Sequence, residues 1–527
     1  MRKIQRIASI LPLVILMLLF SGAVRRSRAQ QNPPRDEVTQ QSLKFAQVYA
    51  ALDRNYMDPI DPDRLILEGG VRGMLASLDP FSSFFDQDQF KQLQQQTRGE
   101  ALGFGSILYV QTGKVMVIQA QQGSPAWRAG LGPGDQIIAV NGVELNTLSF
   151  QQLIHTLERA RSHDVHLSVL RPGDSSPVTY HLVPAEVALP TVDIAFAYSS
   201  GIGYIHVASF ESKTPDEVVD ALKKFDYKSL RGLILDLRNN PGGMLDSAVA
   251  LCSLFLKPGS VVLTLQGRSV PEKTYATIQA PIQVGLPLIV LVNGNTASAA
   301  EVVTAALQDH DRALVVGEPT FGKGVVESVM PLSDDTAIAL LTSEYFTPSG
   351  RSIQKPLPGT ALDNPIRGIQ ASGAGVTSAS DFHTADGRRL SADGGITPDV
   401  SDATPKLDPW MEFLNQAGLF NSFAAEYVTY HAKIGKTFEP DESTLEEFRN
   451  FLTAQRVKTP EEYWSADRGL LATNIKVALF NLVFGLDYAN QVSTLSDPVV
   501  KKAAELFPQV PFLLRGPGQL AKASPER

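Results

Sequence analysis

From Gly201 onwards, strand-like and helix-like segments alternate along the chain. The short apolar runs IGYIHV, GLILDL, PLIVLVN and RALVVG are separated by the amphipathic stretches PDEVVDALKKF, LDSAVALCSLFL and AEVVTAALQD. Strands separated by helices in this way join into βαβ units, in which the strands run parallel and the helices cover the sheet. The alternation therefore predicts an α/β layer.

The segments before and after this layer differ from it in hydrophobic periodicity and residue type, so the predicted fold class is α/β and multidomain. Residues 37–95 carry apolar side chains at helical spacing and predict a small helical domain. Residues 97–186 change to β-branched runs divided by Gly and Pro turns, which indicates a compact β-rich module. The α/β layer occupies residues 187–404, and a helical, polar extension occupies residues 405–527. With 527 residues, of which 43% are hydrophobic, the chain is long enough for several globular domains.

The charge and the cysteine content exclude several classes of partner. The formal net charge is −8, and no cluster of Lys and Arg lies on a predicted helix face, so nucleic acid is not expected as a partner. The single cysteine, Cys252, has no intrachain disulfide partner, and its apolar surroundings indicate a packed helix position. The sequence contains no H-E-x-x-H motif and no Cys/His metal set, so neither a metal ion nor another cofactor is predicted.

The N-terminal 29 residues have the pattern of an export signal. Arg2, Lys3 and Arg6 precede an uncharged apolar run over residues 7–24, and a small-x-small cleavage site ends at Ala29. The expectation is cleavage after Ala29 and delivery to the periplasm or cell envelope. The run is also long enough for a marginal membrane span, so a retained anchor that attaches the protein to the membrane is the alternative.

Ser298 lies where an apolar run ends and a helical pattern begins, in VNGNTASAAEVVTAALQDH. Ser298 and Glu301 form the S-x-x-E pattern of a capping box, in which both side chains satisfy free backbone N–H groups. A serine at a helix N-terminus is also well placed as a nucleophile, because the free N–H groups there can stabilise an oxyanion. The local pattern alone leaves both interpretations open.

Two further motifs contain groups that would complete such a site. In LDLRNNPGG, Gly242 and Gly243 follow a buried-looking strand, and their N–H groups either line an oxyanion hole or belong to an ordinary turn. In TFGKG, Lys323 is either a solvated loop residue or, if it is buried beside a serine, a general base. His310 lies about three helical turns from Ser298, so it offers no better base.

Taken together and in this order, the motifs resemble those of the carboxyl-terminal processing proteases, the tail-specific serine endopeptidases with an embedded PDZ domain. The resemblance extends over about residues 37–400, and it implies a PDZ-like peptide-binding domain at residues 97–186 and a protease core at residues 187–404. It rests on the stretches LDPFSSFF, GFG, GSPAWRAGLGPGDQIIAVNG, LDLRNNPGG, NTASAAE, TFGKG, YFTPSGRSIQ and GGITPDV.

The resemblance also implies roles for individual residues. Ser298 is the expected nucleophile and Lys323 the expected general base of a Ser-Lys dyad. The expected oxyanion hole uses the backbone of Ala299 and of Gly242 or Gly243. A helix start and a nucleophile are then compatible at Ser298, since the helix dipole helps to stabilise the oxyanion.

The sequence departs from the family pattern at two positions. The family usually has a glutamine four residues after the lysine, where this sequence has Glu327. A carboxylate there favours the ammonium form of Lys323, which opposes its role as a base. Phe81 stands where histidine is more familiar, and no function is assigned to it.

The stretch GEALGFGSIL resembles the carboxylate-binding loop of PDZ domains. In such loops, backbone N–H groups receive a free chain terminus, and the peptide adds to the sheet as a strand. An ordinary hairpin turn is the alternative. The candidate residues are Leu102, Gly103, Phe104 and Gly105. The expected partners are protein or peptide substrates with exposed C-termini.

The sequence supports two functions. The leading one is an exported serine endopeptidase that captures C-termini and cleaves with Ser298 and Lys323. The alternative is a PDZ-containing peptide-binding protein, a pseudoprotease in which Glu327 locks Lys323 as an ion pair. Residues 405–527 lie outside the resemblance, and three roles stay open for them: a substrate platform, an oligomerisation element or a docking domain for an adaptor protein.

Overall fold

The computed structural model describes most of the chain and divides it into two compact units. One unit ends at Val71 and the other begins at Arg72. The predicted signal peptide or anchor, residues 1–29, lies outside the described residues. No helix among the described residues combines the length and the apolar character that crossing a membrane requires. The described residues are 35–199, 201–225, 230–279, 285–360, 362, 382–403, 405–431 and 434–515.

The boundary between the two units falls within the segment predicted as an N-terminal helical domain. The first unit contains helix α1 (Arg35–Asn55) and the π-helical segment η1 (Arg64–Val71). The second unit starts with helix α2 (Arg72–Ala76), strand β1 (Ser83–Phe85) and helix α3 (Gln87–Thr97). The LDPFSSFF segment, which contains β1, therefore belongs with the rest of the second unit.

A six-stranded sheet with crossover helices forms the expected α/β layer, which confirms the predicted fold class. The strands are β10 (Val192–Ser199), β11 (Ile202–Val207), β12 (Gly232–Asp236), β15 (Leu288–Val292), β16 (Leu314–Gly317) and β19 (Val400–Ser401). The helices are α6 (Thr214–Lys224), α7 (Leu245–Ser253) and α8 (Ala299–Asp309). The strand order is β10-β11-β12-β15-β16-β19, with β10 antiparallel to β11 and every later pair parallel.

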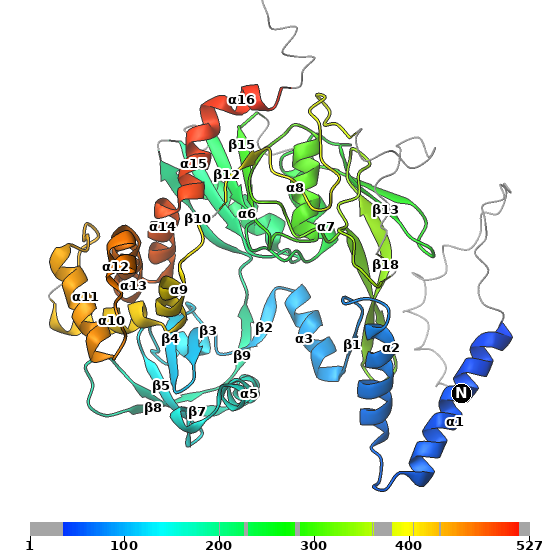
Figure 1. The fold of residues 1–527 in the computed structure, drawn as a ribbon, viewed down its shortest axis with the longest axis horizontal. Coiled ribbons are helices and arrows are strands. Elements are labelled where there is room, and N and C mark those ends of the chain that lie inside the picture. The colour runs from blue at the N-terminus through cyan, green and yellow to red at the C-terminus, as the bar shows by residue number, and fades with distance from the viewer. Residues whose placement is uncertain are drawn as a thin grey trace, which may run out of the picture. The chain divides into compact units, whose positions relative to one another are not determined.

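Helices cover both faces of this sheet (Figure 1). Leu233 and Leu235 of β12 point into a core that they share with α6, α7 and α8. Ile234, between them, points to the other face, because successive side chains of a strand alternate. Both faces are buried, which explains why the strands read as continuous apolar runs. The second face is covered by α15 (Pro498–Leu506), η3 (Phe507–Gln509) and α16 (Val510–Leu513).

The C-terminal helices contact β12 closely. A β-carbon at Gly232, the first residue of β12, would lie 2.4 Å from the ring of Phe507, so a residue without a side chain is needed there. Just beyond the strand, Arg238 pairs with the buried Asp236 at 2.6 Å and with Asp497 at 2.8 Å. The last helices of the predicted C-terminal extension, residues 405–527, thus cover one face of the sheet that carries the catalytic candidates.

A second, antiparallel sheet is built around the long strand β18 (Ala337–Phe346). Strand β18 pairs with β1, with β17 (Val325–Pro331) and with β13 (Val261–Gln266), and β14 (Lys273–Ala276) pairs with β13. The register between β17 and β18 shifts between Val326 and Glu327, where Thr342 of β18 is the extra residue of a β-bulge. Strand β18 therefore joins the LDPFSSFF segment to the strand that follows TFGKG.

The β-rich module contains a sheet of order β3-β4-β5-β7-β8, with β6 paired to β5 and a separate ribbon of β2 and β9. Strand β3 lies at the edge of its sheet, so one side of its backbone is free to pair. The elements are β2 (Glu100–Gly103), β3 (Ser106–Gln111), β4 (Lys114–Ala120), α4 (Pro125–Arg128), β5 (Gln136–Val140), β6 (Val143–Glu144), η2 (Leu145–Thr147), α5 (Phe150–Ala160), β7 (Val165–Leu170), β8 (Val178–Leu182) and β9 (Ala185–Ala188).

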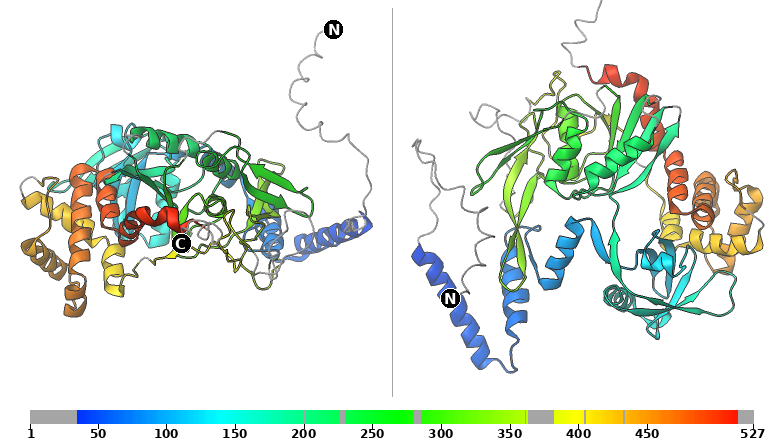
Figure 2. Two further views of the ribbon diagram at one scale, coloured as in Figure 1. Left: turned by 90° about the horizontal axis from the view of Figure 1, so that it is seen from above. Right: turned by 180° about the vertical axis from the view of Figure 1, so that it is seen from behind.

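The remaining helices form a core of their own and contact the β-rich module (Figure 2). Lys114 Nζ donates to Ser422 Oγ at 2.5 Å, and Asn481 Nδ2 donates to the carbonyl of Ile118 at 3.3 Å. These helices are α9 (Pro409–Gln416), α10 (Leu419–Tyr430), α11 (Glu442–Ala454), α12 (Glu461–Ala466), α13 (Arg468–Phe484) and α14 (Leu486–Ser496).

Candidate active site and peptide-binding loop

Ser298 lies between β15 and α8 in an unusual backbone conformation. Its φ of 53° and ψ of −119° are outside the regions that residues with a β-carbon normally adopt. The serines before α4 and α5, Ser124 and Ser149, are extended instead, with φ of −74° and −65°, and their hydroxyls accept backbone N–H groups. Strained residues persist only where their surroundings fix them, and they cluster at functional sites. The conformation favours the functional interpretation of Ser298.

The loop before Ser298 is fixed by hydrogen bonds to the turn that follows β12. The Thr296 hydroxyl donates to the Leu237 carbonyl at 2.8 Å, and Ala297 N–H donates to the Asn240 carbonyl at 2.9 Å. These bonds join the ends of two neighbouring parallel strands, where active-site residues of α/β sheets commonly lie. They supply the surroundings that hold the strained serine.

The NPGG turn packs directly against Ser298. A β-carbon at Gly242, whose φ is 101°, would lie 2.8 Å from Ser298 Cβ. Gly242 N–H is already engaged, because it donates to Asn240 Oδ1 at 2.8 Å. Within the part of the chain that the structure describes, the N–H groups of Gly243 and Ala299 have no protein acceptor. The geometry thus favours Gly243, and not Gly242, as the partner of Ala299 in an oxyanion hole.

A buried glutamate in the first turn of α8, Glu301, joins Ser298 to the loop that carries Lys323. Its Oε2 accepts the backbone N–H groups of Ser298 and Lys323, both at 2.9 Å. Its Oε1 accepts the Thr320 hydroxyl at 2.5 Å and Gly322 N–H at 2.8 Å. Burial raises the pKa of Glu301, while these hydrogen bonds act in the opposite direction because they favour the carboxylate. The predicted capping residue is therefore also a bridge between the two catalytic candidates.

A buried tyrosine of β18 spans the same two segments. The Tyr345 hydroxyl lies 3.1 Å from the carbonyl of Ser298 and 2.9 Å from the carbonyl of Lys323. Burial raises the pKa of Tyr345, so its hydroxyl is a neutral donor. Glu301 and Tyr345 together fix the backbones of the candidate nucleophile and the candidate base relative to each other.

The side chain of Lys323 is turned toward the two residues at which the sequence departs from the family pattern. Its Nζ lies 3.2 Å from Glu327 Oε1 and 4.5 Å from the centroid of the Phe81 ring. Among the described residues, no hydrogen bond joins Lys323 Nζ to the Ser298 hydroxyl. Glu301 thus links the backbones of Ser298 and Lys323, while the amine of Lys323 contacts Glu327 and Phe81.

The loop between β2 and β3 contains the residues predicted to bind a peptide C-terminus. Leu102 and Gly103 belong to the ladder of β2 with β9. Gly105 has a φ of 70°, and a β-carbon there would lie 2.3 Å from Ser124 Cβ, so glycine is required. In the described residues, Phe104 N–H and Gly105 N–H have no protein acceptor. The loop thus offers two free donors at the beginning of the edge strand β3.

Arg161, the residue after α5, lies beside this loop. A β-carbon at Gly103 would lie 3.2 Å from Arg161 Cγ, so the stem of the arginine passes over the glycine. Arg161 is exposed, and its guanidinium forms no ion pair with any residue that the structure describes. A cation beside free N–H groups suits a carboxylate ligand, since charge-assisted hydrogen bonds are stronger than neutral ones.

Comparison with known proteins identifies the family of the chain. A family model for peptidase family S41 matches residues 201–366, one for the PDZ domain matches residues 116–171, and one for the activating protease CtpB N-terminal domain matches residues 20–89. A carboxy-terminal-processing protease of Bartonella bacilliformis is 32% identical over 318 residues, which cover 60% of this chain and 73% of that protein. The chain belongs to the carboxy-terminal-processing proteases.

Two further proteins are similar to parts of this chain. A carboxyl-terminal-processing protease of Synechocystis sp. is 35% identical over 319 residues, which cover 59% of this chain and 73% of that protein. The solved structure of the photosystem II D1 C-terminal processing protease is 26% identical, with a TM-score of 0.36, and covers 70% of this chain and 93% of that one. The helices α9 to α16 lie outside the three matched family ranges.

Sequence reasoning missed three residues at the sites of this carboxy-terminal-processing protease. Glu301 was interpreted only as a cap, although an acidic residue after a small-residue run was the available signal. Tyr345 lies in the recognised YFTPSG stretch, but nothing local indicates that its hydroxyl reaches two distant carbonyls. Arg161 follows the amphipathic segment SFQQLIHTLERA, and only the folded chain brings it to Gly103.

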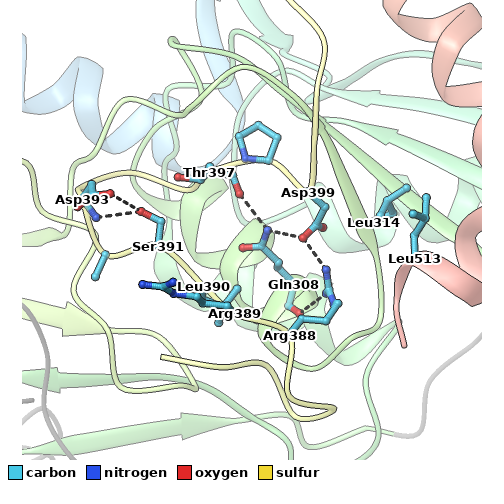
Figure 3. Close-up of a pocket in the computed structure, with 12 residues that line it drawn as sticks. Gln308, Leu314, Arg388, Arg389, Leu390, Ser391, Asp393, Thr397, Asp399 and Leu513 are labelled. Carbon is cyan, nitrogen blue, oxygen red and sulfur yellow. Dashed lines mark hydrogen bonds and ion pairs between the residues drawn. The ribbon is translucent and has the colours of Figure 1, made fainter. Parts of the chain in front are cut away.

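A cavity of about 760 Å³, shown in Figure 3, is lined by Gln308 near the C-terminal end of α8, which is the end opposite to Ser298. Since α8 has 11 residues, the cavity is roughly 15 Å from the serine along the helix. Two of its charged lining residues, Arg388 and Asp399, pair at 2.5 Å, and Arg388 also pairs at 2.6 Å with Asp311, which lies outside the lining. Gln308 Nε2 also donates to Asp399 at 3.1 Å. This network fastens the loop before β19 to α8 and is separate from the candidate active site.

Metal-ligating side chains and the thiol of Cys252 are the remaining candidates for chemistry among the described residues. No group of three or more His, Cys, Asp and Glu side chains in that part of the chain is arranged to hold a metal ion. Cys252 is fully buried in α7, and burial raises the pKa of its thiol. Its surroundings are those of a packed helix residue.

Proposed function

We propose that this protease is an exported serine endopeptidase that recognises protein C-termini through its PDZ domain and hydrolyses peptide bonds with Ser298 and Lys323. The strained backbone of Ser298 at the start of α8 is the observation that carries the proposal. A nucleophile there lies beside free N–H groups and at the positive end of the helix dipole.

In the proposed reaction, the Ser298 hydroxyl attacks the scissile carbonyl while the amine of Lys323 accepts its proton. The oxygen of the tetrahedral intermediate receives hydrogen bonds from Ala299 N–H and Gly243 N–H. The lysine then donates the proton to the departing amine, which leaves an acyl-enzyme on Ser298. Water activated by the same amine hydrolyses the ester, as in other activated-nucleophile proteases.

The proposed substrates are proteins or peptides with exposed C-termini. The free donors of Phe104 and Gly105, together with Arg161, support capture of a terminal carboxylate, and the edge strand β3 supports pairing with the peptide backbone. Export to the periplasm or cell envelope rests on the basic and apolar pattern of the N-terminal sequence. A retained membrane anchor over residues 7–24 is the alternative form.

A second candidate function is supported by one contact. The ion pair of Lys323 with Glu327, at 3.2 Å, is the arrangement expected of a pseudoprotease that only binds peptides. In such a protein the ammonium would stay paired, and no general base would be available.

A serine-directed acylating probe separates the two functions. The expected result is labelling of the parent protein on Ser298, seen by mass spectrometry, and no labelling of Ser298→Ala. Ser124→Ala is the matched control, because Ser124 also precedes a helix but lies in the PDZ domain, and it should be labelled as the parent is. A parent protein that is folded but reacts neither with the probe nor with a peptide of free C-terminus between pH 6 and pH 10 supports the pseudoprotease. That range covers about four pH units, from slightly acidic to alkaline, and includes the pH at which lysine bases of catalytic sites operate.

A further inference from the structure

The LDPFSSFF segment brings a phenylalanine against the candidate base. The centroid of the Phe81 ring lies 4.5 Å from Lys323 Nζ, and Glu327 Oε1 lies 3.2 Å from the same nitrogen. The side chains of Lys323 and Glu327 are 19% and 31% exposed, so water screens the ammonium only in part. A π face and a carboxylate both attract a cation and not a neutral amine.

The turn that carries Phe81 is held independently of Lys323. The buried Asp79 accepts Phe81 N–H at 2.8 Å and Ser82 N–H at 2.6 Å through Oδ1, and the Ser82 hydroxyl donates to Oδ2 at 2.8 Å. Directly after the turn, Phe84 is buried within β1, which pairs with β18. The backbone that carries the Phe81 ring is thus fixed by hydrogen bonds to Asp79 and by the pairing of β1 with β18.

Strand β18 brings both partners of the ammonium to the same place. Its Leu341 is the register partner of Glu327, next to the register shift at which Thr342 of β18 is left without a partner in β17. Leu341 N–H lies 3.4 Å from the Ser82 hydroxyl. Bulges re-aim side chains and are frequent next to active sites. One residue of β18 therefore connects the turn of Phe81 with the position of Glu327.

We propose that Phe81 is a positioning residue for Lys323: its ring and the Glu327 carboxylate hold the ammonium in a resting position away from Ser298. The inference rests on the proposed role of Lys323 as general base. An ammonium held in this position cannot accept the serine proton. Catalysis requires Lys323 Nζ to lose its proton and to move away from the Phe81 ring.

The other titratable groups that face Lys323 act on its backbone. Glu301 accepts the N–H of Lys323 at 2.9 Å, and the Tyr345 hydroxyl lies 2.9 Å from its carbonyl. The negative charge of Glu301 also favours the ammonium, but the same charge is present in every variant of the experiment below. The contribution of the ring is therefore measurable by itself.

The test compares pH profiles of kcat/KM for one peptide with a free C-terminus. Phe81→Leu removes the π face and keeps an apolar side chain, so the ascending limb should move to lower pH and kcat/KM on that limb should rise about two- to fivefold. Phe81→Trp restores a π face and should keep the limb at or above the parent pH. In a Glu327→Gln background the effect of Phe81→Leu should shrink, because two contacts with one ammonium are not additive.

A second measurement does not depend on turnover. In a Ser298→Ala background, acetylation of Lys323 by an amine-reactive reagent is followed against pH by mass spectrometry. The midpoint should move to lower pH in Phe81→Leu and not in Phe81→Trp. Lys355, whose Nζ donates to the Thr320 carbonyl at 2.7 Å, is an internal reference in the same region and should keep its midpoint.

Phe84→Leu is the matched control for damage to the segment, because it alters β1 and has no contact with Lys323. Coincident limbs and midpoints for the parent and Phe81→Leu, or an equal shift in Phe84→Leu, would overturn the inference. If the parent fails to cleave peptides and to react with the serine probe, the proposed function fails. The acetylation midpoints then still decide whether the ring holds the ammonium.

Discussion

The two helices α5 and α8 each have 11 residues and a serine as the N-cap, but only the N-cap serine of α8 has a strained backbone. In each, the side chain three residues later accepts the serine N–H: Gln152 from Ser149 at 3.0 Å, and Glu301 from Ser298 at 2.9 Å. Ser149 is extended and exposed, whereas Ser298 has a φ of 53° and is held between hydrogen-bonded loops. The comparison shows that one local motif can cap a helix or hold a nucleophile, and that the surrounding chain decides which.

At their C-terminal ends the contrast is reversed, because the end of α8 is buried and the end of α5 is exposed. Helix α8 ends at Asp309, which pairs with Arg351 at 2.9 Å, and both side chains are 1% exposed. Helix α5 is followed by the exposed Arg161, which lies beside the loop proposed to bind a peptide C-terminus. Helix α8 thus uses its N-terminal end for the proposed chemistry and buries the other, while α5 presents its C-terminal end to the proposed ligand.

The largest expected effect comes from removing the reactive groups at the start of α8. Ser298→Ala and Lys323→Ala should each lower kcat/KM by at least about 10³-fold, and the double variant should be little worse, because a dyad acts as a unit. The measurement is hydrolysis of a peptide with a free C-terminus, with the thermal midpoint as a check on folding. Turnover near the parent rate in either purified variant would remove the assignment and make Ser298 a cap like Ser149.

Changing Glu301, which links the backbones of Ser298 and Lys323, should have the next largest effect. Glu301→Gln keeps the shape but replaces one acceptor oxygen with a donor, so some of its partners lose their acceptor. We expect kcat/KM to fall about 10- to 100-fold, since small displacements of catalytic groups are costly, and stability to fall by about 1–3 kcal/mol.

A matched control separates the two effects of Glu301→Gln. The half-buried Glu217 of α6 accepts Thr191 N–H at 2.7 Å and Val192 N–H at 3.0 Å, far along the chain from Ser298. Glu217→Gln should lower stability without a comparable loss of turnover. Equal losses of turnover in both variants would mean that Glu301 acts on stability alone.

The C-terminal end of α5 should affect binding and not chemistry. Arg161→Gln is expected to weaken binding of a free-acid peptide about 10-fold, because a charge-assisted hydrogen bond is lost. The same peptide with an amidated C-terminus should bind weakly and be insensitive to the substitution. Arg159→Gln, an exposed arginine in the last turn of α5, is the control. Calorimetric affinities that are equal for acid and amide peptides would refute recognition of the terminus.

The smallest expected effect is at the ordinary cap. Ser149→Ala should lower the free energy of unfolding by about 1 kcal/mol, as for other serine caps, and should leave kcat/KM within about twofold of the parent. Denaturant unfolding and peptide hydrolysis measure the two quantities. A loss of turnover comparable to that of Ser298→Ala would erase the distinction between the two serines.

The sequence allowed the α/β layer and the order of its parts to be predicted, because buried strands and amphipathic helices leave local periodicity. The PDZ domain and the protease family followed from motifs that the comparisons confirm. The positive φ of Ser298 could not be predicted, since it arises from the hydrogen bonds of Thr296 and Ala297 to a turn distant in sequence.

Contacts between distant segments account for the other omissions. The S-x-x-E motif indicates that Glu301 binds the Ser298 amide, but it carries no information about Thr320 or Gly322. Phe81 was noticed only as an unexpected residue, because its place against Lys323 depends on the pairing of β1 with β18. Pairings of this kind depend on the whole fold and leave no local period.

The helices that cover the second face of the catalytic sheet come late in the chain. Ile234, Ile289 and Leu291 stay unshielded until α15 has been made, although Ser298 and every described strand precede it. Long-range burial is completed last in such a fold, and partly covered sheets are prone to aggregate. A nascent chain stopped before Pro498 would carry the proposed reaction centre on a sheet with one face uncovered. The order of synthesis thus leaves this face of the sheet open until the residues of α15 follow.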